Sequence, residues 1–398
     1  MNAGRQAFLI SAAHKSSGKT TVSIGLAAAL NSRGLVVQTF KKGPDYIDPM
    51  WLTQATGRAC RNLDLYLSDE AACRRAFADY GRDAAVAIVE GNKGLYDGLA
   101  LDGSNSNAAL AHALDLSVIL VIDCRGMIRG VAPLVLGYQA FDPGLRIAGV
   151  ILNRVGGPRH ERKLREVLAC YTQVPVLGAI PETPELSLTE RHLGLMPSNE
   201  DPEAADKIAT LARITARCVD IDALLALCPA APSAPPATTP VIPFPARAPR
   251  ANRDCTLRVG VIRDRAFGFY YADDLDALRA AGGELHFIDS LRDNRLPEID
   301  ALFIGGGFPE TLAASLEANA PLRGELRRAI DAGLPTYAEC GGLMYLSRGI
   351  QWQGHRYEMV GVIAAETVVR PKPVGRGYVE LEATAEHPWW PAGTRLKG

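Results

Sequence analysis

The stretch FLISAAHKSSGKTTVSIGLAAALNSRG, residues 8–34, decides the fold of the N-terminal half of this chain. A short apolar run leads through Gly18, Lys19 and Thr20 into an alanine-rich, helix-like stretch. In a P-loop the glycine lets the backbone approach a phosphate, the lysine neutralises the outer phosphates, and the hydroxyl binds Mg²⁺. Ala13 stands where the first glycine of that motif is expected, so the sequence predicts a variant P-loop. A chance GKT at a helix start is the alternative, but the preceding apolar strand favours a nucleotide site.

Apolar runs continue to alternate with helical patterns along the chain. Such alternation is typical of an open α/β sheet whose parallel strands are buried on both faces. The pattern starts again after residue 256, which predicts a second α/β domain. The expected strands are 8–13, 36–40, 85–91, 117–123, 147–153 and 174–180 in the first domain, and 257–262, 284–289, 301–307 and 335–340 in the second.

Residues 229–250 hold 8 of the 26 prolines and cannot form a regular helix or a central strand. The sequence therefore predicts a nucleotide-binding domain at 1–228, a proline-rich linker at 229–252, and a second domain at 253–398.

Composition excludes several classes of protein. A net charge of −1 argues against a nucleic-acid-binding surface. The eight cysteines show no CxxC pair, so neither a disulfide framework nor a zinc site is expected. The N-terminus lacks the features of a signal peptide, and no apolar run reaches membrane-spanning length. We expect a cytoplasmic protein with no membrane partner.

Charged residues follow two of the predicted strands, in KKGPDYIDP (41–49) and VEGNKGLYDG (89–98). Ligands of open α/β sheets bind at the carboxyl ends of the strands, so these loops are expected to converge on the phosphates. Thr20, Asp45 and Glu90 together offer the oxygen ligands that Mg²⁺ prefers. The alternative is that each carboxylate only caps a helix or contacts water. This alternative is less favoured, because acids follow two successive strands beside the Gly-Lys-Thr sequence.

Cys340 lies in TYAECGGLMYL (336–346), where a strand turns into a helix. A thiol at such a corner is exposed, and a helix N-terminus favours its thiolate. FIGGGFPE (303–310) offers backbone amides near Gly306 and Gly307 as an oxyanion hole. The alternative is a small buried side chain, as we expect for the other seven cysteines.

A cysteine hydrolase needs a histidine base, yet no histidine lies in a recognisable catalytic setting. His286 falls within a predicted strand, His355 in a turn, and His387 before Pro-Trp-Trp. The other four are in the first domain: His14, His112, His160 and His192.

Five motifs in this order, HKSSGKTT, KKGPDYIDP, VEGNKGLYDG, LFIGGGFPE and YAECGGLMYL, resemble the cobyrinate a,c-diamide synthase family. The resemblance implies that the domain at 1–228 is an ATP-binding amidoligase domain, similar to dethiobiotin synthetase, that also binds Mg²⁺. It implies a C-terminal domain like the class I, triad-type glutamine amidotransferases. Such an enzyme activates the a and c carboxylates of cobyrinate or hydrogenobyrinate as acyl phosphates and amidates them with glutamine nitrogen, in cobalamin biosynthesis.

The resemblance also assigns roles to residues of this chain. Gly18, Lys19 and Thr20 match the nucleotide loop, and Cys340 matches the glutaminase nucleophile. The family's histidine base lies farther downstream than residue 398, so the second domain is expected to be C-terminally incomplete and ammonia to replace glutamine. A homodimer is possible. Asp45, Asp48, Glu90 and Asp97 match the acidic positions for metal binding and activation, and Lys42, Tyr46 and Lys93 are candidates for binding the corrinoid.

Two alternatives remain open at this stage. A related amidotransferase acts on nickel sirohydrochlorin, and cobyrate synthase amidates other side chains of the corrin. Partitioning-type P-loop ATPases are a different class of protein, but they carry a signature lysine at a position that His14 holds here, one place before Lys15.

Overall fold

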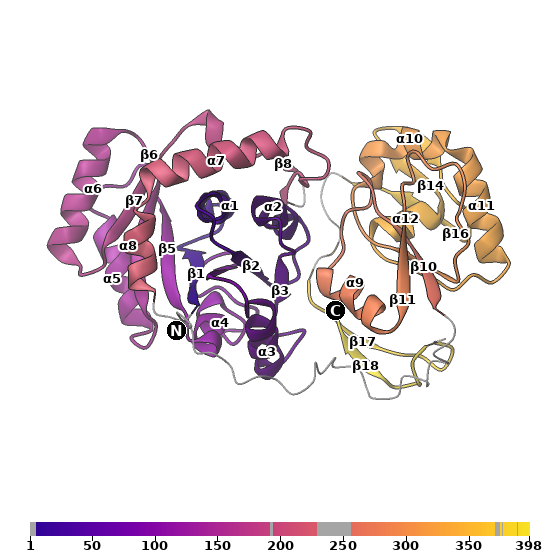
Figure 1. Ribbon diagram of the computed structural model, residues 1–398, viewed down its shortest axis with the longest axis horizontal. Coiled ribbons are helices and arrows are strands. Elements are labelled where there is room, and N and C mark those ends of the chain that lie inside the picture. Colours follow the sequence, from indigo (N-terminus) through magenta and orange to yellow (C-terminus); the bar gives the residue numbers. More distant parts are fainter. Residues whose placement is uncertain (1–4, 192–193, 229–255, 371–374, 376, 388) are drawn as a thin grey trace. The chain divides into compact units, whose positions relative to one another are not determined.

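The computed structural model describes residues 5–191, 194–228, 256–370, 375, 377–387 and 389–398 (Figure 1). They form two compact units. The first comprises Met1–Thr189, Glu203–Thr238 and Gly377–Gly398, and the second Glu190–Pro202 and Thr239–Arg376. The expected linker lies outside the described residues, so the predicted domain limits stay a prediction. The C-terminal segment nevertheless packs with the first unit.

The first unit is built on a parallel sheet with the order β3-β2-β4-β1-β5-β6-β7. Its six longer strands are those expected from the apolar runs. β3 was not expected, because its three residues, Arg-Asn-Leu, carry no apolar pattern. The strands are β1 Gln6–Ala12, β2 Val37–Lys42, β3 Arg61–Leu63, β4 Val86–Glu90, β5 Ser117–Asp123, β6 Ile147–Val155 and β7 Val176–Pro181.

Helices cover both faces of this sheet (Figure 1). The alanine-rich α1 is buried along most of its length, because α7 packs over it. Gly25 permits this close approach, since a Cβ there would lie 2.1 Å from the Thr215 hydroxyl. The helices are α1 Lys19–Ser32, α2 Ile47–Thr56, α3 Glu70–Tyr80, α4 Asn107–Leu114, α5 Val131–Phe141, α6 Pro158–Tyr171, α7 Ala204–Cys218 and α8 Ile221–Leu227.

The second unit repeats the α/β design with a four-stranded parallel sheet, ordered β11-β10-β12-β13. Strand β14 pairs with β15 and β16 in a separate small sheet. The strands are β10 Leu257–Ile262, β11 Gly283–Ile288, β12 Ala301–Ile304, β13 Thr336–Ala338, β14 Ser347–Trp352, β15 His355–Glu358 and β16 Ile363–Val368. The helices are α9 Ala272–Ala280, α10 Ala313–Ala318, α11 Ala320–Asp331 and α12 Gly341–Leu346.

The order of the first sheet positions the site. Strands β2, β4 and β1 are adjacent, so the loops that follow them lie side by side at one edge. These are the P-loop and the two charged loops predicted from the sequence. None of the helices in the described ranges has the length and apolar character required to cross a bilayer.

Candidate active sites

The P-loop closes tightly around Gly18. This residue has φ 85°, a left-handed conformation that suits glycine, and α1 begins at the next residue, Lys19. The Asn153 amide donates to the Ser17 carbonyl at 2.9 Å, and a Cβ on Gly18 would lie 2.1 Å from that amide nitrogen. Glycine is therefore required here both by the backbone and by the packing of β6 against the loop.

A network of charged side chains joins the P-loop to the neighbouring strand ends. The Thr20 hydroxyl lies 2.6 Å from Glu90 Oε1 and 3.2 Å from Asp48 Oδ2. Lys41 Nζ donates to Asp48 Oδ2 at 2.5 Å and to Glu90 Oε1 at 3.1 Å, and it lies 3.8 Å from Asp45 Oδ2. Lys41 was not predicted as a site residue. Its position at the end of a predicted strand, next to the acidic loop, is the sequence feature that could have identified it.

The electrostatics of this network follow from burial and from neighbouring charge. Burial lowers the Lys41 pKa, but the carboxylates of Asp48, Glu90 and Asp45 outweigh it and hold that pKa well above its usual value. Burial raises the pKa of Glu90, and burial together with Asp48 raises that of Asp45 to about 7. The cluster holds one buried ammonium among three carboxylates, so its charge balance depends on Lys41.

Lys19 begins α1 with its side chain buried. Burial and the charge of Lys41 lower the pKa of Lys19 to about 8. A triphosphate at the P-loop would oppose that shift, because an anion favours the charged form of a lysine.

The donor set fits Mg²⁺ only in the company of a nucleotide. Glu90 Oε2 is buried and has no hydrogen-bond partner among the described residues, and the Thr20 hydroxyl and an Asp48 oxygen lie beside the other Glu90 oxygen. Within the described ranges, no group of three or more His, Cys, Asp or Glu side chains is arranged to hold a metal alone. Mg²⁺ commonly takes one or two carboxylates together with substrate phosphates and water, which matches this set.

The other predicted acids have local roles in the structure. Asp45 Oδ1 accepts from the backbone N–H groups of Ile47 and Asp48, at 2.9 and 3.1 Å, and so caps the start of α2. The structure thus places Asp48 rather than Asp45 beside Thr20. Asp97 Oδ2 accepts from the Gly94 N–H at 2.9 Å, and its charge acts on Lys19. All four predicted acids lie at or just beyond the carboxyl ends of β2 and β4, with Glu90 the last residue of β4 and Asp48 in the first turn of α2.

The three predicted substrate-binding residues differ in exposure. Lys42 is buried, and its Nζ donates to the Asn105 carbonyl at 2.7 Å. Lys93 is exposed with a left-handed φ of 50°, and Tyr46 is half-buried at the residue before α2. Of the two lysines, only Lys93 presents its side chain at the surface.

Cys340 sits at a strained corner between β13 and α12. Its φ of 49° and ψ of −114° are rare for a residue with a side chain. A Cβ on Gly306 would lie 3.3 Å from Cys340 Sγ, and one on Gly341 would lie 2.9 Å from the Gly307 nitrogen. The two glycines predicted as an oxyanion hole therefore adjoin the thiol.

The protonation of Cys340 differs from the sequence-based expectation. Burial raises the pKa of the thiol, the backbone N–H groups of Gly341 and Gly307 lower it, and the carboxylates of Glu339 and Glu310 raise it, with a net rise. The dipole of α12 does not reverse this, because the helix spans only six residues.

No histidine in the described part of the chain hydrogen-bonds Cys340. His355 Nδ1 lies 3.2 Å from the Gln353 carbonyl, and His286 Nε2 lies 3.6 Å from Glu284. His387 belongs to the first unit, where its Nδ1 accepts from the backbone of Trp389 and Trp390.

Known proteins match the chain over both units. The CobQ/CobB/MinD/ParA nucleotide binding domain matches residues 9–195, and the CobB/CobQ-like glutamine amidotransferase domain matches residues 258–398. The cobyrinate a,c-diamide synthase of Magnetococcus marinus is 46% identical over 97% of this chain and 82% of that protein. The chain belongs to the cobyrinate a,c-diamide synthase family. The Methanosarcina acetivorans enzyme of the same name is 43% identical over 91% of this chain and 76% of its own.

Membership of the cobyrinate a,c-diamide synthase family confirms the predicted fold class and the predicted enzyme class. The chain is an amide-forming ligase with a nucleotide-binding α/β domain and a glutamine amidotransferase domain. Among solved structures, the septum site-determining protein MinD complexed with Mg-ADP from Pyrococcus horikoshii is 19% identical over 52% of this chain and 94% of that chain. Its TM-score of 0.32 is too low to support an argument. The roles of the individual site residues stay predictions.

Proposed function

We propose that this chain is an ATP- and glutamine-dependent a,c-diamide synthase that acts on cobyrinate or hydrogenobyrinate in cobalamin biosynthesis. Two relatives named cobyrinate a,c-diamide synthase support the substrate class. The observation that carries the reaction type is the network of Thr20, Lys41, Asp48 and Glu90, which joins the P-loop to the ends of β2 and β4.

The first step activates the acceptor. A carboxylate resists attack by ammonia because its negative charge makes the carbonyl carbon a poor electrophile. In our proposal, an acceptor oxygen attacks the γ-phosphorus of ATP, ADP leaves, and an acyl phosphate forms. In this proposal Lys19, at the start of α1, and Lys41, beside Asp48, would neutralise charge on the transferring group. Thr20, Asp48 and Glu90 would hold Mg²⁺, which supplies further charge neutralisation on the phosphates when it is bound.

The second step forms the amide. Ammonia attacks the acyl carbon, phosphate leaves, and the nitrogen loses a proton. Asp45 is a candidate acceptor for that proton, because its pKa of about 7 lets it exchange protons near neutrality. In the second unit, the Cys340 thiolate would attack the side-chain amide of glutamine, with the N–H groups of Gly306 and Gly307 stabilising the oxyanion. The amide nitrogen would take a proton from water and leave as ammonia, and the hydroxide would then cleave the thioester to glutamate and the Cys340 thiolate.

The test is amidation of defined tetrapyrroles. The chain is incubated with ATP, Mg²⁺ and an ammonium salt, and separately with cobyrinate, hydrogenobyrinate, nickel sirohydrochlorin or the a,c-diamide as acceptor. We expect two amide groups on cobyrinate or hydrogenobyrinate, with ¹⁸O passing from the labelled carboxylate to phosphate. No product from either acid, or turnover of nickel sirohydrochlorin or the a,c-diamide alone, would refute the assignment. Product without ¹⁸O in phosphate would refute the acyl phosphate.

The nitrogen source tests the second unit separately. Since no described histidine hydrogen-bonds Cys340 and the thiol has a raised pKa, we expect glutamine to support much slower turnover than ammonium. Glutamine-driven turnover equal to that with ammonium would show that one of the histidines acts as the base after all. A homodimer stays a prediction that light scattering tests.

A further inference from the structure

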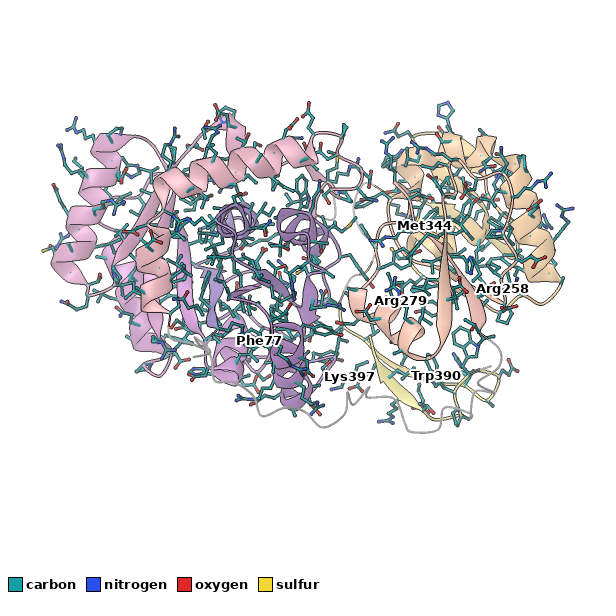
Figure 2. The ribbon with its side chains drawn as sticks, viewed as in Figure 1. Phe77, Arg258, Arg279, Met344, Trp390 and Lys397 are labelled. Carbon is teal, nitrogen blue, oxygen red and sulfur yellow. The ribbon has the colours of Figure 1, made fainter. Side chains whose placement is uncertain are left out.

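The C-terminal segment, residues 377–398, packs within the first unit although it lies in the range that matches the amidotransferase domain. Its two strands, β17 Glu380–Glu382 and β18 Arg395–Lys397, pair antiparallel. Two backbone hydrogen bonds of 2.7 and 3.0 Å between Val379 and Gly398 extend the pair. Lys397 and Trp390 of this segment are labelled in Figure 2.

Three contacts attach this segment to the loop that follows β3. The Tyr378 hydroxyl donates to Asp64 Oδ2. The rings of Tyr378 and Tyr66 have centroids 4.6 Å apart, and Lys397 Nζ lies 4.8 Å from the centre of the Tyr66 ring. Both tyrosines are half-buried and Lys397 is exposed, so aromatic surface and a cation are presented together at the surface.

These contacts lie at the carboxyl edge of the sheet, beside the KKGPD loop. A Cβ on Gly43 would lie 3.8 Å from both the Tyr378 hydroxyl and Asp64 Oδ2, and 3.4 Å from Asn92 Nδ2. Asp64 and Lys93 both act electrostatically on Lys42, so all of these groups share one neighbourhood.

The residues around Tyr378 and the β6 residue that supports the P-loop lie on different sides of the nucleotide loop. Strands β3 and β2 form one edge of the sheet, whereas Asn153, which braces the P-loop, lies on β6 beyond β5. A molecule bound against Tyr378 would reach the activating network from the side of Asp45 and Lys41, opposite to Asn153.

We propose that residues 377–398 form one wall of the acceptor site of the first unit. The rings of Tyr378 and Tyr66 pack against the macrocycle of a polycarboxylate tetrapyrrole, and Lys397 and Lys93 bind its peripheral carboxylates. This inference rests on the function proposed above and names the surface that selects its acceptor. Apolar ring faces beside cations match the chemistry of a large ring that carries acidic side chains.

A purely structural role for Tyr378 makes a different prediction. If it only held the segment to Asp64, removing the hydroxyl would loosen the segment whether or not the ring remained. If the ring contacts the acceptor, Tyr378→Phe keeps most of the binding and Tyr378→Ala loses it. The two substitutions therefore separate the hydrogen bond from the ring.

The experiment uses the full chain with ammonium as nitrogen source and hydrogenobyrinate as acceptor. We expect Tyr378→Ala to raise the acceptor KM about tenfold or more, with the KM for ATP within about twofold of the unaltered chain. Tyr378→Phe should stay within about threefold, and Lys397→Glu should raise the acceptor KM in a salt-dependent manner. The matched control is Tyr171→Ala, an exposed tyrosine under Arg129 in the same unit. It should change neither constant.

The outcomes are distinct. Three results would overturn this inference and leave the proposed function intact. The first is an unchanged acceptor KM in Tyr378→Ala, and the second is a rise in the KM for ATP equal to the rise in the acceptor KM. The third is a rise in the acceptor KM that is as large in Tyr378→Phe as in Tyr378→Ala. No product from the unaltered chain with any tetrapyrrole would overturn the proposed function, and this inference with it.

Discussion

Replacing Lys41 by methionine should destabilise the first unit in a pH-dependent way. Lys41 is 3% exposed and pairs with Asp48 and with the fully buried Glu90. Removing one partner of such a buried cluster costs about 3–5 kcal/mol, because it leaves charges without compensation. For a unit of this size we expect the melting temperature to fall by roughly 6–20 °C at pH 8.

The sign of the pH dependence follows from the carboxylates. The Lys41 pKa is raised well above its usual value, so its contribution is present throughout pH 5–8 and would be lost only at strongly alkaline pH. Asp45, with a pKa of about 7, and Glu90, whose pKa is raised by burial, can take up protons as the pH falls and so relieve the uncompensated charge. The loss of stability in Lys41→Met should therefore be smaller at pH 5 than at pH 8.

The assay is hydrogen exchange at increasing urea, read on peptides from β2 and β4 so that the second unit does not contribute. Lys207→Met is the matched control, because Lys207 on α7 pairs at 3.5 Å with the exposed Glu203, the residue before that helix. That surface pair should contribute no more than about 1 kcal/mol. The double variant Lys41→Met, Glu90→Gln should recover part of the loss. A difference below about 1 kcal/mol at pH 8, or an equal difference at pH 5 and pH 8, would refute the reasoning.

Three further predictions concern single residues. Cys340→Ser should abolish any glutamine hydrolysis, measured as glutamate release, and leave ammonium-driven amidation within about twofold; loss of both activities would contradict independent sites. Gly18→Ala should reduce ATP affinity at least about tenfold in calorimetry, since a Cβ would lie 2.1 Å from Asn153 Nδ2 and φ is 85°; unchanged affinity would rule out the P-loop as the nucleotide site. Asp45→Asn keeps the oxygen that caps α2. Because the Asp45 pKa is raised to about 7, the stability of the unaltered chain falls as the pH rises from about 4 to 7. The variant should therefore melt at a higher temperature than the unaltered chain at pH 8 but not at pH 4. Equal shifts in melting temperature at the two pH values would exclude this ionisation as the cause.

Much of the fold could be read along the chain. Long apolar runs such as 117–123 coincide with the strand observed, because a parallel strand covered on both faces is buried at every position and is therefore mostly apolar. The three-residue β3 has no such pattern and forms only because β2 offers it a hydrogen-bonding edge. The Gly-Lys-Thr turn was evident because a phosphate loop needs those residue types in consecutive positions.

The pairing of charges could not be read in the same way. Lys41 and Lys42 are neighbours in sequence, but successive side chains of a strand point to opposite faces. Lys41 therefore meets Asp48 and Glu90, while Lys42 meets the Asn105 carbonyl. The sequence indicated Lys42 as a candidate and not Lys41, yet Lys41 is the lysine that the carboxylates surround.

The sequence by itself determined the two α/β domains, the nucleotide loop and the cysteine at a strand-to-helix turn, because each depends on residues that are close together along the chain. Only the tertiary structure decided that Lys41 balances three carboxylates and that residues 377–398 pack with the first unit beside Asp64. Those contacts join segments as far as 314 residues apart, and their geometry is set by the order of strands in the sheet.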